Sequence, residues 1–309
     1  MIKGIFYFLI FPGFLFTAAM GCLSGWFDRK LTARIHWRVG PPWYQNFVDF
    51  LKLLGKEIIV PADSMRGLFL FAPVTAVIGA TLLSVVLWQP NLRTDSGFLG
   101  DLIVAIYLSM IPALALIIGG MASRNPLASL GASREMKLML AYELPFIVSI
   151  ATVIIKNGYT IRLYEMVQHQ AAHGAIIGSP SGFIAFIVAL LCMQAKLGLV
   201  PFDIAEAETE IMGGPLVEYS GAPLGFFRLS KLMMLFAMPV FLITVFWGGI
   251  APGALGAAVG LGKLLVILLV AVLIKNTNPR LRIDQALRFF WGPVTVLAVI
   301  SILLTLAGL

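Results

Sequence analysis

The stretch LVPFDIAEAETEIMGGPLVEYSG, residues Leu199–Gly221, directly follows an apolar run that is long enough to cross a lipid bilayer. It carries a third of the acidic residues of a chain that has only 15: Asp203, Glu206, Glu208, Glu210 and Glu218. Acidic side chains are costly next to lipid, so such a dense group is a candidate for function. The stretch therefore predicts a membrane-spanning helix that ends in a functional polar loop.

The composition extends this interpretation to the whole chain. Of the 309 residues, 60% are hydrophobic and 12% are charged, and the mean hydropathy is +0.95. A core of this size cannot bury so much apolar surface, so most of it must face lipid. We expect an all-α integral membrane protein, a single transmembrane domain over residues 1–309, with about eight transmembrane helices. The apolar stretches lie near residues 4–24, 68–88, 99–121, 138–155, 182–202, 226–248, 253–274 and 288–308.

The positive residues predict the topology. Sixteen of the 22 Lys and Arg residues fall in the loops after the first, third, fifth and seventh spans, or in the turn that leads into the sixth. By the positive-inside rule these loops are cytoplasmic, so the acidic loop is cytoplasmic and both termini lie outside. We expect a multi-pass protein of the plasma membrane. Because the net charge of +7 is spread between the spans, it does not indicate a nucleic acid partner.

Two loops contain amphipathic segments. Apolar residues recur at three- and four-residue steps in the first cytoplasmic loop: Trp43, Phe47, Phe50, Leu51, Leu54 and Ile58. This pattern predicts an amphipathic helix on the membrane surface or, equally, one packed against a cytoplasmic partner. A shorter amphipathic piece is expected around Leu163–His169 in the outer loop, with QHQAAHG read as loop.

The acidic loop admits several interpretations. If residues 203–212 are helical, Asp203 caps the helix and shares one face with Glu206 and Glu210. Neighbouring carboxylates disfavour each other's charge, so the group could store and pass protons. Alternatively, the acids pair with the seven Lys and Arg residues of the first cytoplasmic loop, or they dock a partner protein.

Ionisable residues also occur inside the predicted spans. Glu143 and Lys196 enter the fourth and fifth spans to similar depths from the cytoplasmic side. They could pair, or they could line a wet cavity that opens to the cytoplasm. Lys263 is expected near the middle of the seventh span, and snorkelling to the interface is the alternative for each lysine near a span end. The simplest interpretation is a polar layer in the cytoplasmic half of the membrane.

The chain offers few ligands for a metal or redox cofactor. Cys22 and Cys192 each lie alone in an apolar span, and an iron–sulfur cluster needs about four thiolates. His169 and His173 have the i, i+4 spacing of two metal ligands, but no third ligand is near them in the sequence. We therefore predict no cofactor and no metal site on this chain.

Four segments resemble one known family. They are RVGPPWYQNFVDFLKLLGKE (Arg38–Glu57), SLGASREMKLMLAYELP (Ser129–Pro145), PFDIAEAETEIMGGPLVEYSG (Pro201–Gly221) and NTNPRLRIDQ (Asn276–Gln285). They are similar to the eight-span membrane subunit, the subunit 1 family, that anchors the peripheral arm in respiratory complex I and in energy-converting, group 4 [NiFe] hydrogenases. The first and third segments are closest to the hydrogenase and formate hydrogenlyase branch. The quinone-reducing branch usually has Arg and Glu where this chain has Leu199 and Lys196.

The resemblance implies a coupling role in an ion-translocating oxidoreductase complex, with no catalytic centre on this chain. The iron–sulfur clusters and the nickel–iron site are then expected in partners, namely the hydrogenase large and small subunits and an iron–sulfur subunit, beside antiporter-like membrane subunits. The implied path for protons or sodium ions comprises Glu143, Asp203, Glu206, Glu208, Glu210, Glu218, Lys196 and Lys263, with Arg134 as a charge partner of the acids. The implied docking residues for the peripheral arm are Arg34, Arg38, Lys52 and Lys56. The alternatives are a quinone-reducing complex I and, from another class, a stand-alone secondary transporter.

Overall fold

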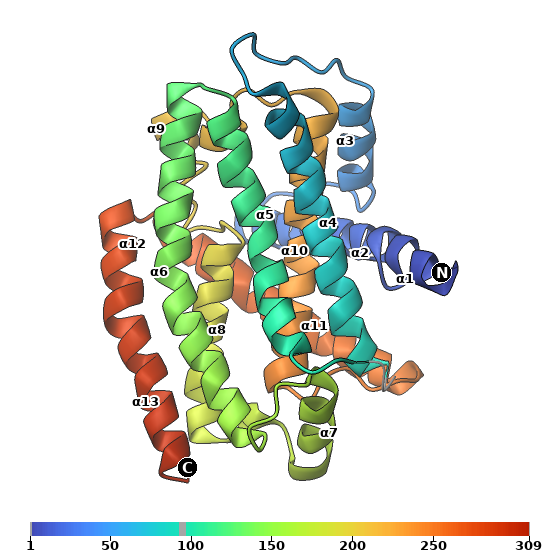
Figure 1. Ribbon diagram of the computed structural model, residues 1–309, viewed down its shortest axis with the longest axis vertical. Helices are drawn as coiled ribbons and strands as arrows, with labels where there is room; N and C mark the ends of the chain where they lie inside the picture. Colours follow the sequence, from blue (N-terminus) through green and yellow to red (C-terminus); the bar gives the residue numbers. More distant parts are fainter. Residues whose placement is uncertain (1, 93–96, 309) are drawn as a thin grey trace.

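All regular secondary structure in the described part of the chain is helical. The computed structural model describes residues 2–92 and 97–308 (Figure 1). The helices are α1 (Ile2–Leu9), α2 (Phe14–Ile35), α3 (Gln45–Leu54), α4 (Arg66–Asn91), α5 (Asp101–Ala122), α6 (Pro126–Lys156), α7 (Leu163–His173), η1 (Ile176–Gly178), α8 (Pro180–Lys196), α9 (Glu208–Ile211), η2 (Gly214–Leu216), α10 (Gly221–Phe246), α11 (Ala254–Thr277), α12 (Ile283–Phe289), η3 (Phe290–Val294) and α13 (Thr295–Leu306). Seven helical segments of the described residues are long and apolar enough to cross a membrane. This confirms the expected all-α membrane protein.

The predicted fifth span is shorter than expected. Its helix, α8, has 17 residues and ends at Lys196 instead of continuing to residue 202. Gly198 adopts a left-handed φ of +56°, and Pro201 has no backbone N–H to donate to a further helical turn. The chain therefore leaves the helix inside the bundle, which places the start of the acidic loop among the other helices.

The first predicted span is broken. Residues 10–13 separate α1 from α2, because Pro12 cannot donate the hydrogen bond that a continuous helix needs there. α2 then continues to Ile35, well beyond the predicted end at residue 24. Figure 1 shows α1 and α2 running across the bundle, whereas α4, α5 and α6 run along it.

The central helix of the bundle is α10. Residues 233–246 are all buried, and α10 packs against α2, α4, α8 and α11. A helix that is apolar on every side is stable only where other helices surround it, and the predicted sixth span is such a helix. α10 thus provides a fixed wall beside the acidic loop.

The amphipathic helix of the first loop is present as α3, but its orientation differs from the expectation. In Figure 1 α3 stands alongside the bundle, in the direction of α4, and does not lie across it as a surface helix would. It packs on α2 and α10 of this chain: Leu53 is buried, and Asn46 Nδ2 donates to Cys22 O at 2.7 Å. The apolar face that predicted lipid or partner contact is thus partly used within the chain.

Helix α7, in the loop that the sequence predicts to lie outside, is longer than predicted. It continues through His173, so the stretch QHQAAHG is helical up to the glycine and not a loop. Gln170 explains the extension, because its buried side chain donates to Thr244 O and Val245 O at the end of α10. Gly174, with a φ of +95°, then ends the helix.

Candidate functional site

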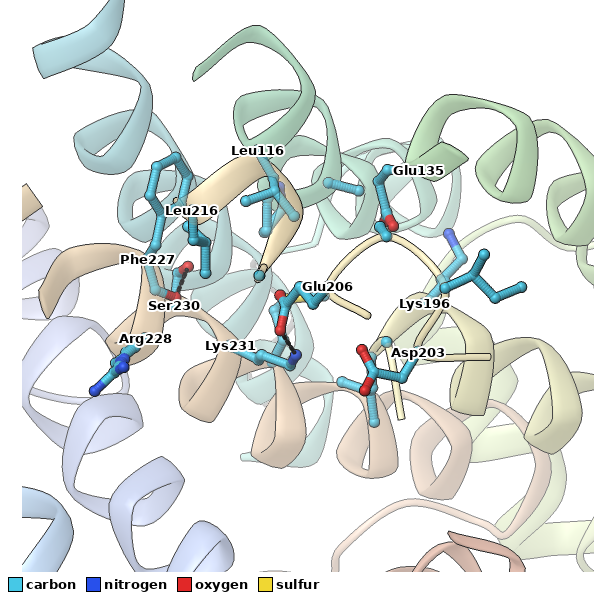
Figure 2. A pocket seen from close by; sticks show the side chains of 18 of the residues that line it. Leu116, Glu135, Lys196, Asp203, Glu206, Leu216, Phe227, Arg228, Ser230 and Lys231 are labelled. Carbon is cyan, nitrogen blue, oxygen red and sulfur yellow. Dashed lines mark hydrogen bonds and ion pairs between the residues drawn. The ribbon is translucent and has the colours of Figure 1, made fainter. Parts of the chain in front are cut away.

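A cavity of about 600 Å³ lies between α5, α6, α10 and the acidic loop, residues 199–221. Apolar side chains form much of its wall, among them Leu116, Leu216 and Phe227. Its charged lining is Glu135, Lys196, Asp203, Glu206, Arg228 and Lys231. Figure 2 shows these side chains converging from different elements of the fold. Six ionisable groups around one partly apolar cavity interact strongly, because the effective dielectric constant there is far below that of water.

The acidic loop is not the helix that spacing suggested. Residues 203–207 are irregular, and only the short α9, Glu208–Ile211, is helical. Asp203 therefore does not cap a helix; its Oδ2 accepts a hydrogen bond from Arg280 Nη2 at 2.9 Å. Four or five carboxylates on one short helix would repel one another, whereas an irregular loop lets each acid reach its own partner.

The acids pair with Arg134, the charge partner that the resemblance implies, and with cations that the sequence did not single out as their partners. Glu206 Oε2 lies 2.7 Å from Lys231 Nζ of α10, and Glu210 pairs with Arg134 of α6. Glu218 Oε1 accepts a hydrogen bond from Asn125 Nδ2, the residue that caps α6. The expectation that the acids pair with the first cytoplasmic loop is therefore wrong for Asp203, Glu206 and Glu210. The side chain of Glu208 lies outside the described part of the chain.

Glu143 and Lys196 meet inside the bundle. Lys196 Nζ lies 2.9 Å from Glu143 Oε2, and the lysine side chain is only 1% exposed. The ammonium group also donates to Ser109 Oγ at 3.1 Å and lies 4.6 Å from the ring centre of Phe146. Glu143 Oε1 has no hydrogen-bond partner among the described residues. The two residues thus form a pair, and Lys196 also borders the cavity.

The end of the acidic loop is anchored to the bundle. The Tyr219 ring stacks on Phe69 of α4 with 4.1 Å between ring centres, and its hydroxyl donates to Phe69 O at 3.0 Å. Burial raises the pKa of Tyr219 above its usual range, so the hydroxyl stays protonated as a donor. At Gly131 of α6, an added Cβ would come within 2.6 Å of Pro215 Cδ. This close approach fixes the loop against α6.

Comparison with known proteins decides the family. Residues 7–306 match the family described as NADH dehydrogenase. This chain belongs to that family. A membrane subunit of the NADH-quinone oxidoreductase of Brevibacillus brevis is 32% identical over 315 residues, covering 97% of this chain and 92% of the relative. Its counterpart from Dehalococcoides mccartyi is 30% identical and covers 97% of this chain and 85% of the relative.

A solved structure supports the same family. A chain of the membrane-bound sulfane sulfur reductase, an archaeal respiratory membrane complex, superposes with a TM-score of 0.86 and 32% identity. The match covers 94% of this chain and 96% of that one. This chain is therefore a multi-pass membrane subunit of the complex I-like family. The hydrogenase branch stays a prediction, and the names of the relatives favour the quinone-reducing alternative.

Lys263 lies apart from the other residues of the predicted ion path. Its ammonium group donates to Trp247 O at 2.6 Å and to Gly249 O at 3.0 Å, which is the outer end of α10. A cation there stabilises the carbonyl end of the helix. The structure thus gives Lys263 a helix-terminal contact and does not place it in the polar layer around the cavity.

The predicted docking residues lie on the surface of the first loop region. Arg34, Arg38, Lys52 and Lys56 are all exposed, and within the described residues none of them takes part in an ion pair. Trp37, between the two arginines, is 99% exposed. An aromatic residue among unpaired cations is typical of a surface that a partner or a headgroup layer covers.

Sequence reasoning missed Glu135 and Asp28. Glu135 is 6% exposed and lines the cavity, yet its position falls in a predicted loop because the fourth span is expected to begin only at residue 138. The signal for an earlier start is Asn125 followed by Pro126, which caps and opens α6. Asp28 is missed because the first span is expected to end at residue 24, whereas α2 continues to Ile35 and includes Asp28.

Proposed function

We propose that this chain docks the peripheral redox arm of a complex I-like respiratory complex and couples its electron transfer to ion translocation. The observation that carries the proposal is a chain of ionisable groups from the cavity into the bundle. We call it the charge network, and it consists of Glu135, Glu143, Lys196, Asp203, Glu206 and Lys231.

Burying the charge network costs desolvation free energy, so its presence calls for a functional explanation. A buried ion pair seldom stabilises a fold more than apolar side chains of similar volume would, because both ions lose their hydration. Lys196 is nevertheless fully enclosed, with Glu143 as its only ion-pair partner among the described residues. A selective reason for retaining such a pair is that it responds to charge changes nearby.

Coupling follows from electrostatics at short range. Two unit charges about 4 Å apart interact by about 4 kcal/mol at the effective dielectric constant of a protein. When a redox event beside the cavity changes the charge near Glu206, the Lys231 pair rearranges, and Glu135, Asp203 and Lys196 at the same cavity respond. Each step moves a proton or a side chain by a short distance and passes the change toward Glu143.

Two versions of the complex are candidates, and they differ in the electron acceptor. The quinone-reducing version is favoured by the names of the relatives and by a cavity with apolar walls and a few polar groups, which suits a quinone headgroup. The hydrogenase-type version is favoured by Lys196 and Leu199, where the quinone-reducing branch usually has Glu and Arg. In both, the iron–sulfur clusters lie in partner chains, and the second version adds a nickel–iron site there.

Purification in mild detergent with identification of the bound chains separates these versions. A nickel–iron large subunit supports the hydrogenase version, and quinone-reductase partners support the other. Reconstituted vesicles then test coupling through Glu206→Gln, which removes the charge that holds Lys231. We expect the ions moved per electron to fall about fivefold. A chain that transports an ion alone, without redox partners, would overturn the proposal.

A further inference from the structure

A second, partly buried ion pair lies outside the site described above. Lys275 Nζ of α11 lies 2.8 Å from Oδ2 and 3.1 Å from Oδ1 of Asp28 on α2. The Asp28 side chain is 12% exposed and the Lys275 side chain is 25% exposed, so the carboxylate is about as enclosed as that of Glu143, whereas the lysine is more open than Lys196. Neither residue takes part in the acidic-loop hydrogen bonds and ion pairs described above.

A second cavity joins this pair to the acidic loop. It has a volume of about 260 Å³, and Asp28, Lys275, Asp203 and Lys231 all line it. Asp203 and Lys231 also line the larger cavity, so the two cavities share these charged walls. A cavity of this volume has room for several water molecules, and its charged side chains, Arg29 included, offer them hydrogen-bond partners between apolar walls.

Because both cavities are lined by Asp203 and Lys231, a charge change in the acidic loop can act on the pair of Asp28 and Lys275. Lys231 is held by Glu206 on the side of the larger cavity. If Glu206 takes up a proton, the Lys231 ammonium group loses its ion-pair partner and competes with Lys275 for the Asp28 carboxylate through the hydrated second cavity. The charge on Asp28 is then shared between two cations instead of one, which loosens the contact between α2 and α11.

We propose that Asp28 and Lys275 form a further station of the charge network, reached through a hydrated second cavity on the side of α2 and α11. Asp28 is a positioning residue, since it holds Lys275 and responds to Lys231. The inference rests on the proposed function. A purely structural role, in which the pair only ties α2 to α11, is the outcome that the experiments below distinguish from it.

Hydration of the second cavity is tested without any activity. Val200 lines this cavity, and Val240 is buried in α10 away from it. In the purified complex, Val200→Cys should react with a small charged methanethiosulfonate reagent about tenfold faster than Val240→Cys. The native Cys22 and Cys192 are buried and give the background rate. Equal rates for the two variants would mean a dry cavity and would overturn the inference, whatever the chain's role in coupling.

The role of Asp28 is tested in reconstituted vesicles that contain the whole complex. Asp28→Asn should lower the ions moved per electron about fivefold while electron transfer to a soluble carrier continues. Asp28→Glu, which keeps the charge, should restore the ratio. Glu165→Gln is the control, because it removes an exposed ion pair with Arg162 in the loop before α8. If Asp28→Asn keeps the wild-type ratio while Glu206→Gln loses it, the station is absent and the proposed function stands; if neither variant changes the ratio, the proposed function fails as well.

Discussion

Lys196 of α8 and Glu143 of α6 form an ion pair of 2.9 Å in which the lysine side chain is 1% exposed. The Glu143 side chain is 13% exposed, and both of its carboxylate oxygens are buried. Among the described residues this is the most enclosed ion pair, so its contribution can be tested by stability as well as by activity.

Lys196→Met should destabilise the protein by about 3–5 kcal/mol, because it leaves the Glu143 carboxylate buried without its cation. The double variant Glu143→Gln/Lys196→Met removes both charges and should recover most of this loss. Thermal unfolding of the purified complex measures both effects. If the stability losses of Lys196→Met and of Glu143→Gln alone simply add in the double variant, the two charges are not coupled.

Arg134→Ala should change stability little, because the Glu210 side chain opposite it is 55% exposed and hydrated already. An exposed pair of this kind contributes about 0–1 kcal/mol, and salt weakens it further. The same unfolding measurement at low and high salt checks the size of the effect. A loss as large as that of Lys196→Met would show that the loop pairs are structural supports and not adjustable contacts.

Gly131→Ala should displace the end of the acidic loop, since the new Cβ would lie 2.6 Å from Pro215 Cδ and 2.9 Å from Gly214 Cα. Backbone atoms at that distance must move, so we expect a lower unfolding temperature and weaker coupling. Gly262→Ala is the matched control on α11, where nothing lies within 4 Å of the added Cβ. The control should be neutral or should stabilise by about 0.5–1 kcal/mol, as Gly to Ala in a helix does. Equal behaviour of the two variants would mean that the loop is not fixed against α6.

Charge reversal at Arg34 and Arg38 should reduce the amount of peripheral arm that co-purifies with the membrane part. Both side chains are exposed at the end of α2, so reversal affects a partner surface more than the fold. The ratio of peripheral to membrane subunits after purification is the readout. Arg162→Glu, in the outer loop, is the control and should leave that ratio unchanged. Full retention of the arm in the double reversal would exclude this face as its docking surface.

Local sequence patterns predicted the helices well and the polar contacts less well. Apolar length alone indicated the spans, because a single segment that crosses lipid satisfies its backbone hydrogen bonds only as a helix. Helices α10 and α11 match their predicted ranges within a few residues. Equal depth along two helices offered pairing of Glu143 with Lys196 as one of two alternatives, and the structure shows the pair, with Lys196 also at the cavity. Depth along a helix is a local property, so it could be read from the sequence.

Partners from distant segments could not be predicted in the same way. Asp203 pairs with Arg280, 77 positions later, and Lys275 pairs with Asp28, 247 positions earlier. The sequence shows the charges but not which helices lie side by side. The oblique course of α2 and the early end of α8 decide these contacts, and both depend on how the bundle packs (Figure 1).

The coupling role of the charge network is tested most directly by the number of ions moved per electron in the reconstituted complex that carries Glu143→Gln. We predict that this ratio falls about fivefold while electron transfer to a soluble carrier stays close to wild type, because the redox centres are expected in other chains. An unchanged ratio in a fully assembled complex would mean that Glu143, the buried partner of Lys196, has no part in coupling.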